Sequence, residues 1–388
     1  MAKLGDICVK IENIDSSYDD IIEYIDISSV DNNKKKIIST QIIDFSEAPS
    51  RAKQLIQNGD ILISNVRPNL NAVALVDIET DKTLVASTGY TVIRCNNTAY
   101  NKYVFFFCQY CGFIDSLTQQ ATGASYPAVN SGIIKSIPIP YLPLETQRQI
   151  ASNLDKVTHT IDLCNAILEK LDLLVKSRFV EMFGDLASPN IKWEKCRLID
   201  ACANNDDIKC GPFGTQLSKD EYTESGIAVW EIPQINSEFK TMPIHFITKA
   251  KAQELDSYSI KQGDIAMSRK GNVGRCAVFP EPLENGIIHS DVLRIRVDKN
   301  IVIPEFMMRQ LHYSGDVQHQ IEIVSSGAIM AGINVTKLKQ IYVYIPPLDL
   351  QEQFAAFVEQ TDKSKLAVKQ VLEKAETLKK ALMQEYFG

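Results

Sequence analysis

Two stretches of the chain, residues 143–184 and 347–388, carry apolar residues in alternating steps of four and three. This spacing is typical of a coiled-coil seam, so it predicts one long helix in each stretch, about 57 Å long at about 1.5 Å per residue. Each apolar face needs a partner in water, and the other stretch is favoured over the adjoining domain. The predicted helix-pairing and partner-docking positions are Ile150, Leu154, Val157, Ile161, Leu168, Leu171 and Val175 in the first stretch, and Phe354, Val358, Val368, Leu372 and Leu382 in the second.

The segments ahead of the two helices have a mixed pattern. Runs of β-branched and aromatic residues predict strands, and short helical patterns interleave them. We therefore expect an α+β protein, with two pseudo-equivalent α/β-mixed domains separated by two long antiparallel coiled-coil-like helices. The predicted strands include Asp60–Ile63, Thr91–Ile93, Val292–Val297 and Ile341–Ile345, the helical patterns lie at Lys102–Thr118 and Pro304–His312, and the predicted boundaries are 1–142, 143–184, 185–346 and 347–388.

The two halves of the chain repeat each other. Gly123 returns as Gly327, an offset of 204 positions (327 − 123), and one offset carries the match to Gly388 without a gap. Repetition at a fixed offset indicates two equivalent modules. Other landmarks at this offset are Gly59-Asp60 with Gly263-Asp264, Asn130 with Asn334, Gln147 with Gln351, and Phe183-Gly184 with Phe387-Gly388. Leu4, Asp6 and Cys8 resemble Leu198, Asp200 and Cys202 at an offset of 194, which indicates either ten fewer residues in the second copy or a chance match.

Composition describes an ordinary soluble protein. The 388 residues are 45% hydrophobic, with no apolar run that approaches a membrane span and no apolar signal-peptide core, so we expect a cytoplasmic chain without a membrane partner. The nine cysteines are predicted to be reduced, and the lone Cys108/Cys111 pair lacks the further ligands that a zinc site needs. The net charge of −7 argues against an unaided, highly cationic nucleic-acid binder.

Sequence motifs of catalysis are missing. The chain has no GxxxxGK[ST] loop, no GxGxxG after a predicted strand, no GxSxG elbow and no HExxH pair. Its five histidines form no set with metal-ligand spacing. We therefore expect a binding or organising protein with no catalytic, cofactor-binding or metal-binding residues of its own.

Polar loops follow the equivalent predicted strands but differ in their side chains. Arginine suits guanine O6 and N7, asparagine suits adenine N6 and N7, and serine, lysine and backbone N–H groups suit phosphate. Solvated hairpin turns would use the same residue types, so both interpretations stay open. The candidate DNA-binding residues are Ser64, Asn65, Arg67, Asn69, Asn71, Ser125 and Tyr126 in the first copy, and Thr215, Lys219, Ser268, Arg269, Lys270, Asn272 and Arg275 in the second, where the loop Ser325–Met330 answers the loop at Ser125.

One segment resembles a known family. Pro143-Leu144-Glu145-Thr146-Gln147-Arg148-Gln149-Ile150, placed after a strand and before a long helix, resembles the spacer region of type I restriction–modification DNA specificity subunits, and Pro346–Phe354 repeats it. Thr146 precedes Gln147 where the family has Glu, and Phe354 replaces Ile. The resemblance covers the whole chain in the order domain, helix, domain, helix.

The resemblance implies a function. Each variable domain would be a target recognition domain that reads one half of a bipartite, asymmetric site on double-stranded DNA. The helices would be spacers that set the half-site distance and dock two methyltransferase (modification) subunits. Those subunits would bring S-adenosylmethionine and share the phosphate contacts, and restriction/translocase subunits would join for cleavage. This chain would bind no cofactor and would not be catalytic alone. The resemblance does not assign base-reading residues one by one.

Two other hypotheses compete with DNA recognition. A coiled-coil assembly scaffold would pair other proteins and read no DNA, and an enzyme with an unrecognised centre would act on DNA alone with its cofactor. Substituting Arg67 or Arg269 by Ala separates the first two, because only a DNA reader would change its sequence choice while assembly stays intact.

Overall fold

The computed structural model describes the chain except residues 16, 124, 185–191 and 326–331. Two compact units emerge: unit 1 comprises Met1–Ala166 with Val368–Gly388, and unit 2 comprises Ile167–Ala367. The two long helices are confirmed as α4 (Leu144–Phe183) and α10 (Leu348–Phe387), each of 40 residues. Each of them begins in one unit and ends in the other.

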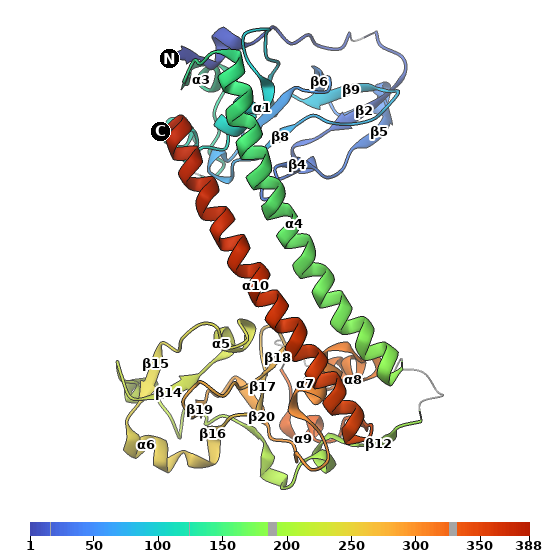
Figure 1. Cartoon of the computed structure of the whole chain (residues 1–388), viewed down its shortest axis with the longest axis vertical. Helices are drawn as coiled ribbons and strands as arrows, with labels where there is room; N and C mark the ends of the chain where they lie inside the picture. The colour runs from blue at the N-terminus through green and yellow to red at the C-terminus, as the bar shows by residue number, and fades with distance from the viewer. Residues whose placement is uncertain (16, 124, 185–191, 326–331) are drawn as a thin grey trace. The chain divides into compact units, whose positions relative to one another are not determined.

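Unit 1 combines two sheets, a two-stranded ladder and short helices (Figure 1). The sheet β5-β2-β9-β6 is parallel only between β2 and β9, the sheet β10-β7-β8 is antiparallel, and β1 pairs with β11. The strands are β1 (Ala2–Lys3), β2 (Ile21–Ile25), β5 (Gln41–Asp44), β6 (Ala52–Leu55), β7 (Ile61–Ser64), β8 (Val73–Leu75), β9 (Thr83–Ser87), β10 (Tyr90–Ile93) and β11 (Pro138–Ile139), with a hairpin of β3 (Val30–Asp31) and β4 (Lys36–Ile37). The helices are α1 (Asn101–Phe107), α2 (Cys111–Gln120) and α3 (Ser131–Ser136).

Unit 2 repeats this plan. The sheet β15-β14-β19-β16 is parallel only between β14 and β19, the sheet β13-β20-β17-β18 is antiparallel, and β12 pairs with β21. The strands are β12 (Glu194–Arg197), β13 (Ile208–Cys210), β14 (Ile227–Trp230), β15 (His245–Ile247), β16 (Ser259–Ile260), β17 (Ile265–Ser268), β18 (Cys276–Val278), β19 (Gly286–Ile288), β20 (Val292–Ile295) and β21 (Tyr342–Ile345). The helices are α5 (Ile232–Asn236), α6 (Lys249–Glu254), α7 (Pro304–Tyr313), α8 (Gly315–Ser325) and α9 (Val335–Leu338).

The repeated Gly-Asp pair makes the same turn in both units. Gly59 and Gly263 have φ of 91° and 85°, a conformation that favours glycine. The aspartate that follows each is buried and receives two hydrogen bonds from an arginine: Asp60 from Arg94, and Asp264 from Arg296. The motif therefore marks the start of β7 and of β17, and it fixes each turn through a buried ion pair.

The sequence match between Leu4-x-Asp6 and Leu198-x-Asp200, at an offset of 194, is also seen in the structure. Leu4 and Leu198 are both fully buried, and their backbone N–H groups donate to Ile137 and Ile341, which are themselves 204 positions apart (341 − 137). Asp6 and Asp200 accept from the backbone N–H groups of Lys3 and Arg197 at the start of the two short 3-10 helices Leu4–Ile7 and Leu198–Ala201. The second copy is thus shorter between these landmarks, and the chance interpretation is wrong.

A buried glutamine explains the repeated Pro-Leu-x-x-Gln-x-Gln pattern. Gln147 and Gln351 are 2% and 0% exposed. The Gln147 amide accepts from the backbone N–H of Tyr100 and donates to the carbonyls of Thr98 and Leu142. The Gln351 amide makes the same set with Ile303, Ile301 and Pro346. In each unit this side chain joins the long helix to the chain before it and to the loop before α1 or α7.

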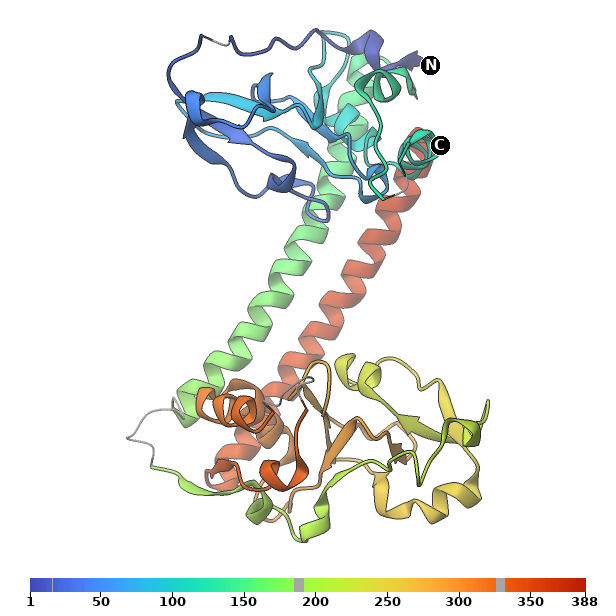
Figure 2. The same ribbon diagram turned by 180° about the vertical axis from the view of Figure 1, so that it is seen from behind.

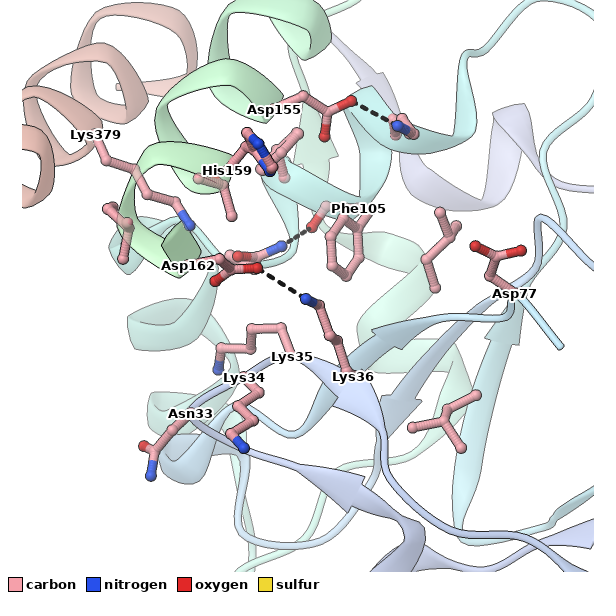
Figure 3. A pocket seen from close by; sticks show the side chains of 17 residues that line it. Asn33, Lys34, Lys35, Lys36, Asp77, Phe105, Asp155, His159, Asp162 and Lys379 are labelled. Atoms are coloured by element: carbon pink, nitrogen blue, oxygen red, sulfur yellow. Dashed lines mark hydrogen bonds and ion pairs between the residues drawn. The ribbon is translucent and has the colours of Figure 1, made fainter. Parts of the chain in front are cut away.

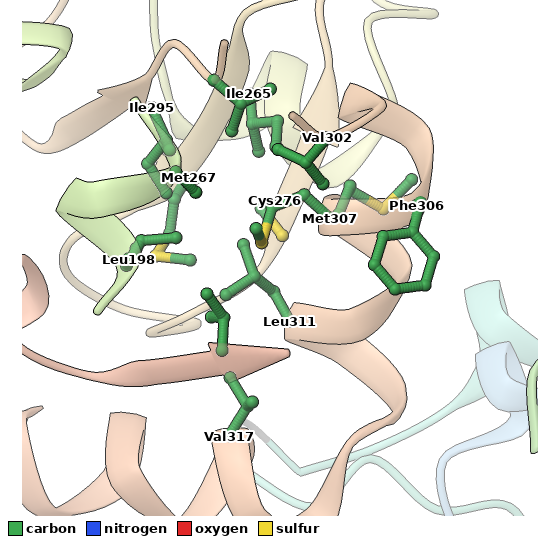
Figure 4. Packing of buried hydrophobic residues seen from close by; sticks show 14 of the residues in the cluster. Leu198, Ile265, Met267, Cys276, Ile295, Val302, Phe306, Met307, Leu311 and Val317 are labelled. Atoms are coloured by element: carbon green, nitrogen blue, oxygen red, sulfur yellow. The ribbon is translucent and has the colours of Figure 1, made fainter. Parts of the chain in front are cut away.

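The ends of the long helices lie in the unit cores. Phe179 and Phe183 of α4 pack with Phe306 and Phe354 in the core of unit 2, whose sheet and α7 side chains are shown in Figure 4. In Figure 2 the orange α7 and α8 lie beside the red start of α10. In unit 1, Phe387 of α10 contacts aromatic rings of α1 and its following turn, with ring centroids 5.2 Å from Tyr103 and 5.6 Å from Phe107.

Within each unit the two helix segments run antiparallel. In unit 1, Asn153 near the start of α4 donates to the hydroxyl of Tyr386 near the end of α10. In unit 2, Lys365 pairs with Asp172 at 2.7 Å, and Phe354 meets Phe179 with centroids 5.5 Å apart. Both predicted modes of packing therefore occur, because the helices contact each other and the adjoining domains. None of the described helices is long and apolar enough to cross a membrane.

Candidate functional site

The residue that follows β7 in unit 1 and β17 in unit 2 occupies one equivalent position. It is Asn65 in unit 1 and Arg269 in unit 2. The backbone hydrogen bonds at the two positions match: Asn65 N–H donates to Gly89 and its carbonyl accepts from Val129, while Arg269 N–H donates to Asp291 and its carbonyl accepts from Ile333. The same backbone frame therefore presents an amide in one unit and a guanidinium in the other.

In unit 1 the loop after β7 carries an exposed arginine. Arg67 is exposed and has φ of 50°, and its guanidinium lies 4.7 Å from the ring centroid of Tyr126. Tyr126 is 68% exposed, so this stacked pair stands at the surface. Asn69 and Ser125 are exposed in the same two loops, which are joined because Arg67 N–H donates to the carbonyl of Pro127. The structure thus brings Arg67 and Tyr126 together from loops far apart in sequence.

In unit 2 the candidates lie around an aromatic ring from another loop. The Arg269 guanidinium lies 5.3 Å from the ring centroid of Phe213, which is half exposed, and it donates to the carbonyls of Ile333 and Ser290. Lys270 is exposed and pairs with Asp291 at 2.8 Å. Among the described contacts, no carboxylate pairs with Arg269, whereas Asp291 pairs with Lys270.

The remaining unit 2 candidates lie on either side of this ring. Thr215 and Lys219 are exposed in the segment that follows Phe213, and Asn272 is exposed in the β17–β18 loop. Arg275 is partly buried and lies 3.6 Å from Glu238. Of the predicted loop Ser325–Met330, residues 326–330 lie outside the described residues.

Three candidates have side chains that lie inside the fold. Ser64 donates to the carbonyl of Val66, and Ser268 is fully buried. Asn71 is buried, donates to the carbonyl of Cys108 and accepts from the ammonium of Lys35. Their sequence positions follow the strands, but their side chains point inward, so they are not part of the DNA-reading surface that we propose below.

A polar cluster next to Arg269 was not among the predicted residues. His245 Nδ1 lies 2.7 Å from a carboxylate oxygen of Glu231, and the ring of His245 stacks on Tyr222 with centroids 4.7 Å apart. His289 Nε2 lies 4.0 Å from the other Glu231 oxygen. These residues come from segments far apart in the sequence, and single histidines at wide spacing gave no signal there. They add hydrogen-bonding groups with both donor and acceptor character to the surface of unit 2.

The predicted seam positions on the long helices are buried or partly buried. Ile150, Leu154, Val175, Phe354 and Val358 are buried. Val157, Ile161, Leu168, Leu171, Val368, Leu372 and Leu382 are partly buried. The seam is thus used largely within the chain. The apolar side chains that stay exposed on these helices are a different set, Leu163, Val371 and Leu378 in unit 1 and Leu173, Leu174, Val180 and Leu366 in unit 2.

No group of three or more His, Cys, Asp or Glu residues that could hold a metal ion occurs in the described part of the chain. The geometry instead offers exposed arginine–aromatic pairs at loop ends, and aliphatic side chains along two helices. Both arrangements suit binding to large partners.

Comparison with protein families gives one match over most of the chain. The model of the "Type I restriction modification DNA specificity domain" matches residues 1–173 and again 191–377. Two curated relatives are specificity subunits of type I restriction enzymes: HindI of Haemophilus influenzae, 26% identical over 174 residues, and EcoBI of Escherichia coli, 20% identical over 289 residues. These alignments cover 44% and 69% of this chain, and 37% and 60% of the relatives, so the chain spans less than two thirds of their length.

Solved structures share the fold. A chain from a structure of the type I R-M system in complex assembly is 24% identical, with a TM-score of 0.61 over 99% of this chain and 96% of that chain. The S subunit of a type I system from M. genitalium is 14% identical, with a TM-score of 0.57 over 100% of this chain and 95% of that chain. The fold class predicted from the repeat is therefore confirmed.

Proposed function

Because this chain belongs to the type I restriction–modification DNA specificity domain family, we propose that it is the DNA specificity subunit of such a complex. Each unit reads one half of a bipartite, asymmetric site on double-stranded DNA. The observation that carries the proposal is the equivalent strand-end position, which holds Asn65 in unit 1 and Arg269 in unit 2 on one backbone frame. An asymmetric site requires like scaffolds with unlike reading groups, because amides and guanidinium groups prefer different bases.

The reading surface that we propose consists of loop residues that are exposed or partly exposed. In unit 1 these are Asn65, Arg67, Asn69, Ser125 and Tyr126. In unit 2 they are Thr215, Lys219, Arg269, Lys270, Asn272 and Arg275, with Phe213 as a platform. An arginine held over an aromatic ring has fewer conformations to lose on binding, which favours a bidentate contact with a guanine edge.

The long helices supply the docking surface for two methyltransferase subunits. Each unit keeps its own exposed aliphatic residues on α4 and α10, the sets at Leu163 in unit 1 and Leu173 in unit 2. Exposed apolar side chains along a helix are typical of partner surfaces. The methyltransferase subunits bring S-adenosylmethionine and the catalytic groups, restriction/translocase subunits join this complex in the cytoplasm, and this chain contributes recognition and spacing without an active site of its own.

The experiment is sequencing of methylated adenine in cells that express this chain with a cognate methyltransferase subunit. Cells with the methyltransferase subunit alone are the control. A new bipartite motif that depends on this chain supports the proposal and gives both half-sites at once. A complex that co-purifies but leaves no motif would replace recognition by the scaffold hypothesis.

A further inference from the structure

A basic cavity lies in unit 1, apart from the reading loops. It has a volume of about 620 Å³ and is lined by residues of the β3–β4 hairpin, α1, α4 and α10 (Figure 3). Five lysines and three aspartates line it: Lys34, Lys35, Lys36, Lys102 and Lys379, with Asp77, Asp155 and Asp162. Figure 3 shows Lys34 and Lys35 on the hairpin side, and Lys379 extending from α10.

The lysines of this cavity divide into paired and unpaired groups. Lys36 pairs with Asp162 at 2.8 Å, and Lys102 pairs with Asp155 at 2.6 Å. Lys34, Lys35 and Lys379 form no ion pair with any described residue. The cavity therefore holds three ammonium groups with no described carboxylate at ion-pair distance, and a bound anion would supply such a partner.

Lys35 is held in place by the fold. Its ammonium donates to the side-chain oxygen of Asn71 at 2.8 Å and also to the Asn71 carbonyl, which leaves one N–H of three. Lys35 has φ of 54°, so the tight hairpin turn aims it inward. Burial and the nearby Lys379 lower the pKa of Lys35 to about 8, against the opposing effect of Asp31.

Lys379 is half-buried on α10, and its ammonium lies 5.8 Å from the ring centroid of Phe106. Burial lowers its pKa, although Asp162 acts in the other direction. Lys35 and Lys379 also line an adjoining cavity of about 540 Å³, together with Lys380 and Glu376. The two cavities thus adjoin, and these two lysines line both parts of the groove.

Unit 2 provides an internal comparison. Its corresponding cleft, of about 650 Å³, is lined by three Lys or Arg residues and four carboxylates, and both of its arginines are paired: Arg275 with Glu238, Arg309 with Glu305. At the repeat offset of 204, Lys34, Lys35 and Lys379 correspond to Glu238, Phe239 and Val175, none of which is a cation. The unpaired cations are therefore particular to unit 1 and not a property of the shared scaffold.

We propose that the groove of unit 1 binds a phosphate group between Lys35 and Lys379, with Lys34 at its rim. A phosphate accepts several hydrogen bonds and suits compact ammonium groups as a point charge. The favoured source is the backbone of the DNA whose recognition is proposed above, so this inference rests on that function. The contact fixes the position of the duplex on unit 1 and carries no base preference.

The first experiment measures phosphate binding to the full chain by isothermal titration, with inorganic pyrophosphate as the probe at constant ionic strength. Lys379→Met keeps the aliphatic stem over Phe106 and removes no hydrogen bond described for the fold. Its matched control is Lys363→Met, an exposed lysine on the same helix that pairs with Glu359. We expect Lys379→Met to weaken binding about tenfold and Lys363→Met to leave it unchanged. Equal affinity of wild type and Lys379→Met, with both folded by circular dichroism, would overturn the proposal.

The second experiment identifies the source of the phosphate in the complex with the methyltransferase subunit. For a DNA backbone contact, Lys379→Met weakens cognate and unrelated duplexes alike and reduces the slope of log K against log salt by about one, while the methylated motif stays the same. Loss of pyrophosphate binding with an unchanged DNA slope instead assigns the groove to a free phosphate compound. Loss of subunit association alone, with both other readouts unchanged, would overturn the phosphate assignment in favour of an acidic protein partner. Absence of any methylated motif in wild type would reject the proposed function, and pyrophosphate titration would still decide whether the groove binds phosphate.

Discussion

Units 1 and 2 are stabilised by the same buried polar groups, and they differ at surface positions where a ligand could bind. The Gly-Asp turn, its arginine and the buried glutamine at the start of each long helix repeat with matching hydrogen bonds. The strand-end position instead changes from Asn65 to Arg269, whose guanidinium lies over Phe213. Buried polar groups must keep their partners, while exposed loop side chains are free to change.

The clefts under the long helices differ in the same way. Gln109 on the turn after α1 corresponds to His312 on α7, at an offset of 203 (312 − 109) that also relates Tyr100 to Ile303. One cleft holds lysines without an ion pair, and the other holds paired arginines with a partly buried histidine. These substitutions leave the backbone plan intact, so they can be exchanged between units to test what each residue does.

The largest expected effect comes from the shared glutamine. Gln351→Ala and Gln147→Ala should each destabilise their own unit by about 3 kcal/mol, because buried backbone groups lose their partners. Hydrogen exchange followed by mass spectrometry measures the two units separately. Similar losses in both units would support the equivalence that the hydrogen bonds indicate.

The second glutamine of each Gln-x-Gln pattern is the matched control. Gln149 and Gln353 are exposed, so replacing either by Ala should change stability by less than about 0.5 kcal/mol. If Gln149→Ala destabilised unit 1 as much as Gln147→Ala does, the role assigned to the buried side chain would be wrong.

A smaller effect, confined to unit 2, depends on pH. The pKa of His312 is lowered to about 4 by burial and by the nearby Arg275 and Arg309, while Glu238 acts in the opposite direction. The Nε2 of His312 accepts a hydrogen bond from the backbone N–H of Cys276. The unfolded chain takes up this proton near its ordinary pKa, so the stability of unit 2 is full above about pH 6.5 and falls as the pH drops towards 4. We expect protonation of His312 to lower the free energy of unfolding of unit 2 by about 2 kcal/mol between about pH 6.5 and pH 4, after allowance for the partial exposure of this side chain.

His312→Gln introduces the residue that unit 1 has at this position. It should remove most of the difference between pH 7 and pH 5 in urea unfolding of unit 2, while unit 1 stays unaffected. An unchanged pH dependence in the variant would assign the acid sensitivity of unit 2 to other groups.

The smallest expected effect concerns base discrimination. Arg269→Asn gives unit 2 the residue of unit 1 and should change recognition at one half-site by about 1–2 kcal/mol, with the other half-site unaltered. Arg67→Ala should act on the opposite half-site. Methylation mapping reads both halves in one experiment, and Lys249→Ala, an exposed lysine on α6, is the control. A change in both half-sites from either single substitution would contradict the division of labour between units.

Much of the fold could be predicted from the repeat and from periodicity. The heptad spacing predicted α4 and α10, and runs of β-branched and aromatic residues predicted β7, β10, β20 and β21, because local patterns determine local elements. Periodicity could not reveal that the end of α4 packs in unit 2 and the end of α10 in unit 1, because the hydrophobic spacing of Phe183 and Phe387 does not identify their partners.

The candidate site could be predicted less well from the sequence than the fold. The position of a loop after a strand does not reveal the direction of its side chains, so Asn71 and Ser268 looked like their exposed neighbours but lie inside. Arg67 and Tyr126, and Arg269 and Phe213, come together only through tertiary contacts. The correspondence of Asn65 with Arg269, in contrast, already follows from the repeat offset of 204 (269 − 65), and the matching backbone hydrogen bonds agree with it.

Unit 1 combines two segments that are far apart in the sequence, and this affects the order in which the two units can fold during translation. Unit 2 is one continuous segment, whereas unit 1 needs Val368–Gly388 to complete a core that contains Phe387. The nascent chain can therefore finish unit 2 before unit 1, although unit 1 is begun first. Until translation has passed Phe387, the rings of Tyr103 and Phe107 lack their contacts with Phe387 and offer an apolar surface to chaperones.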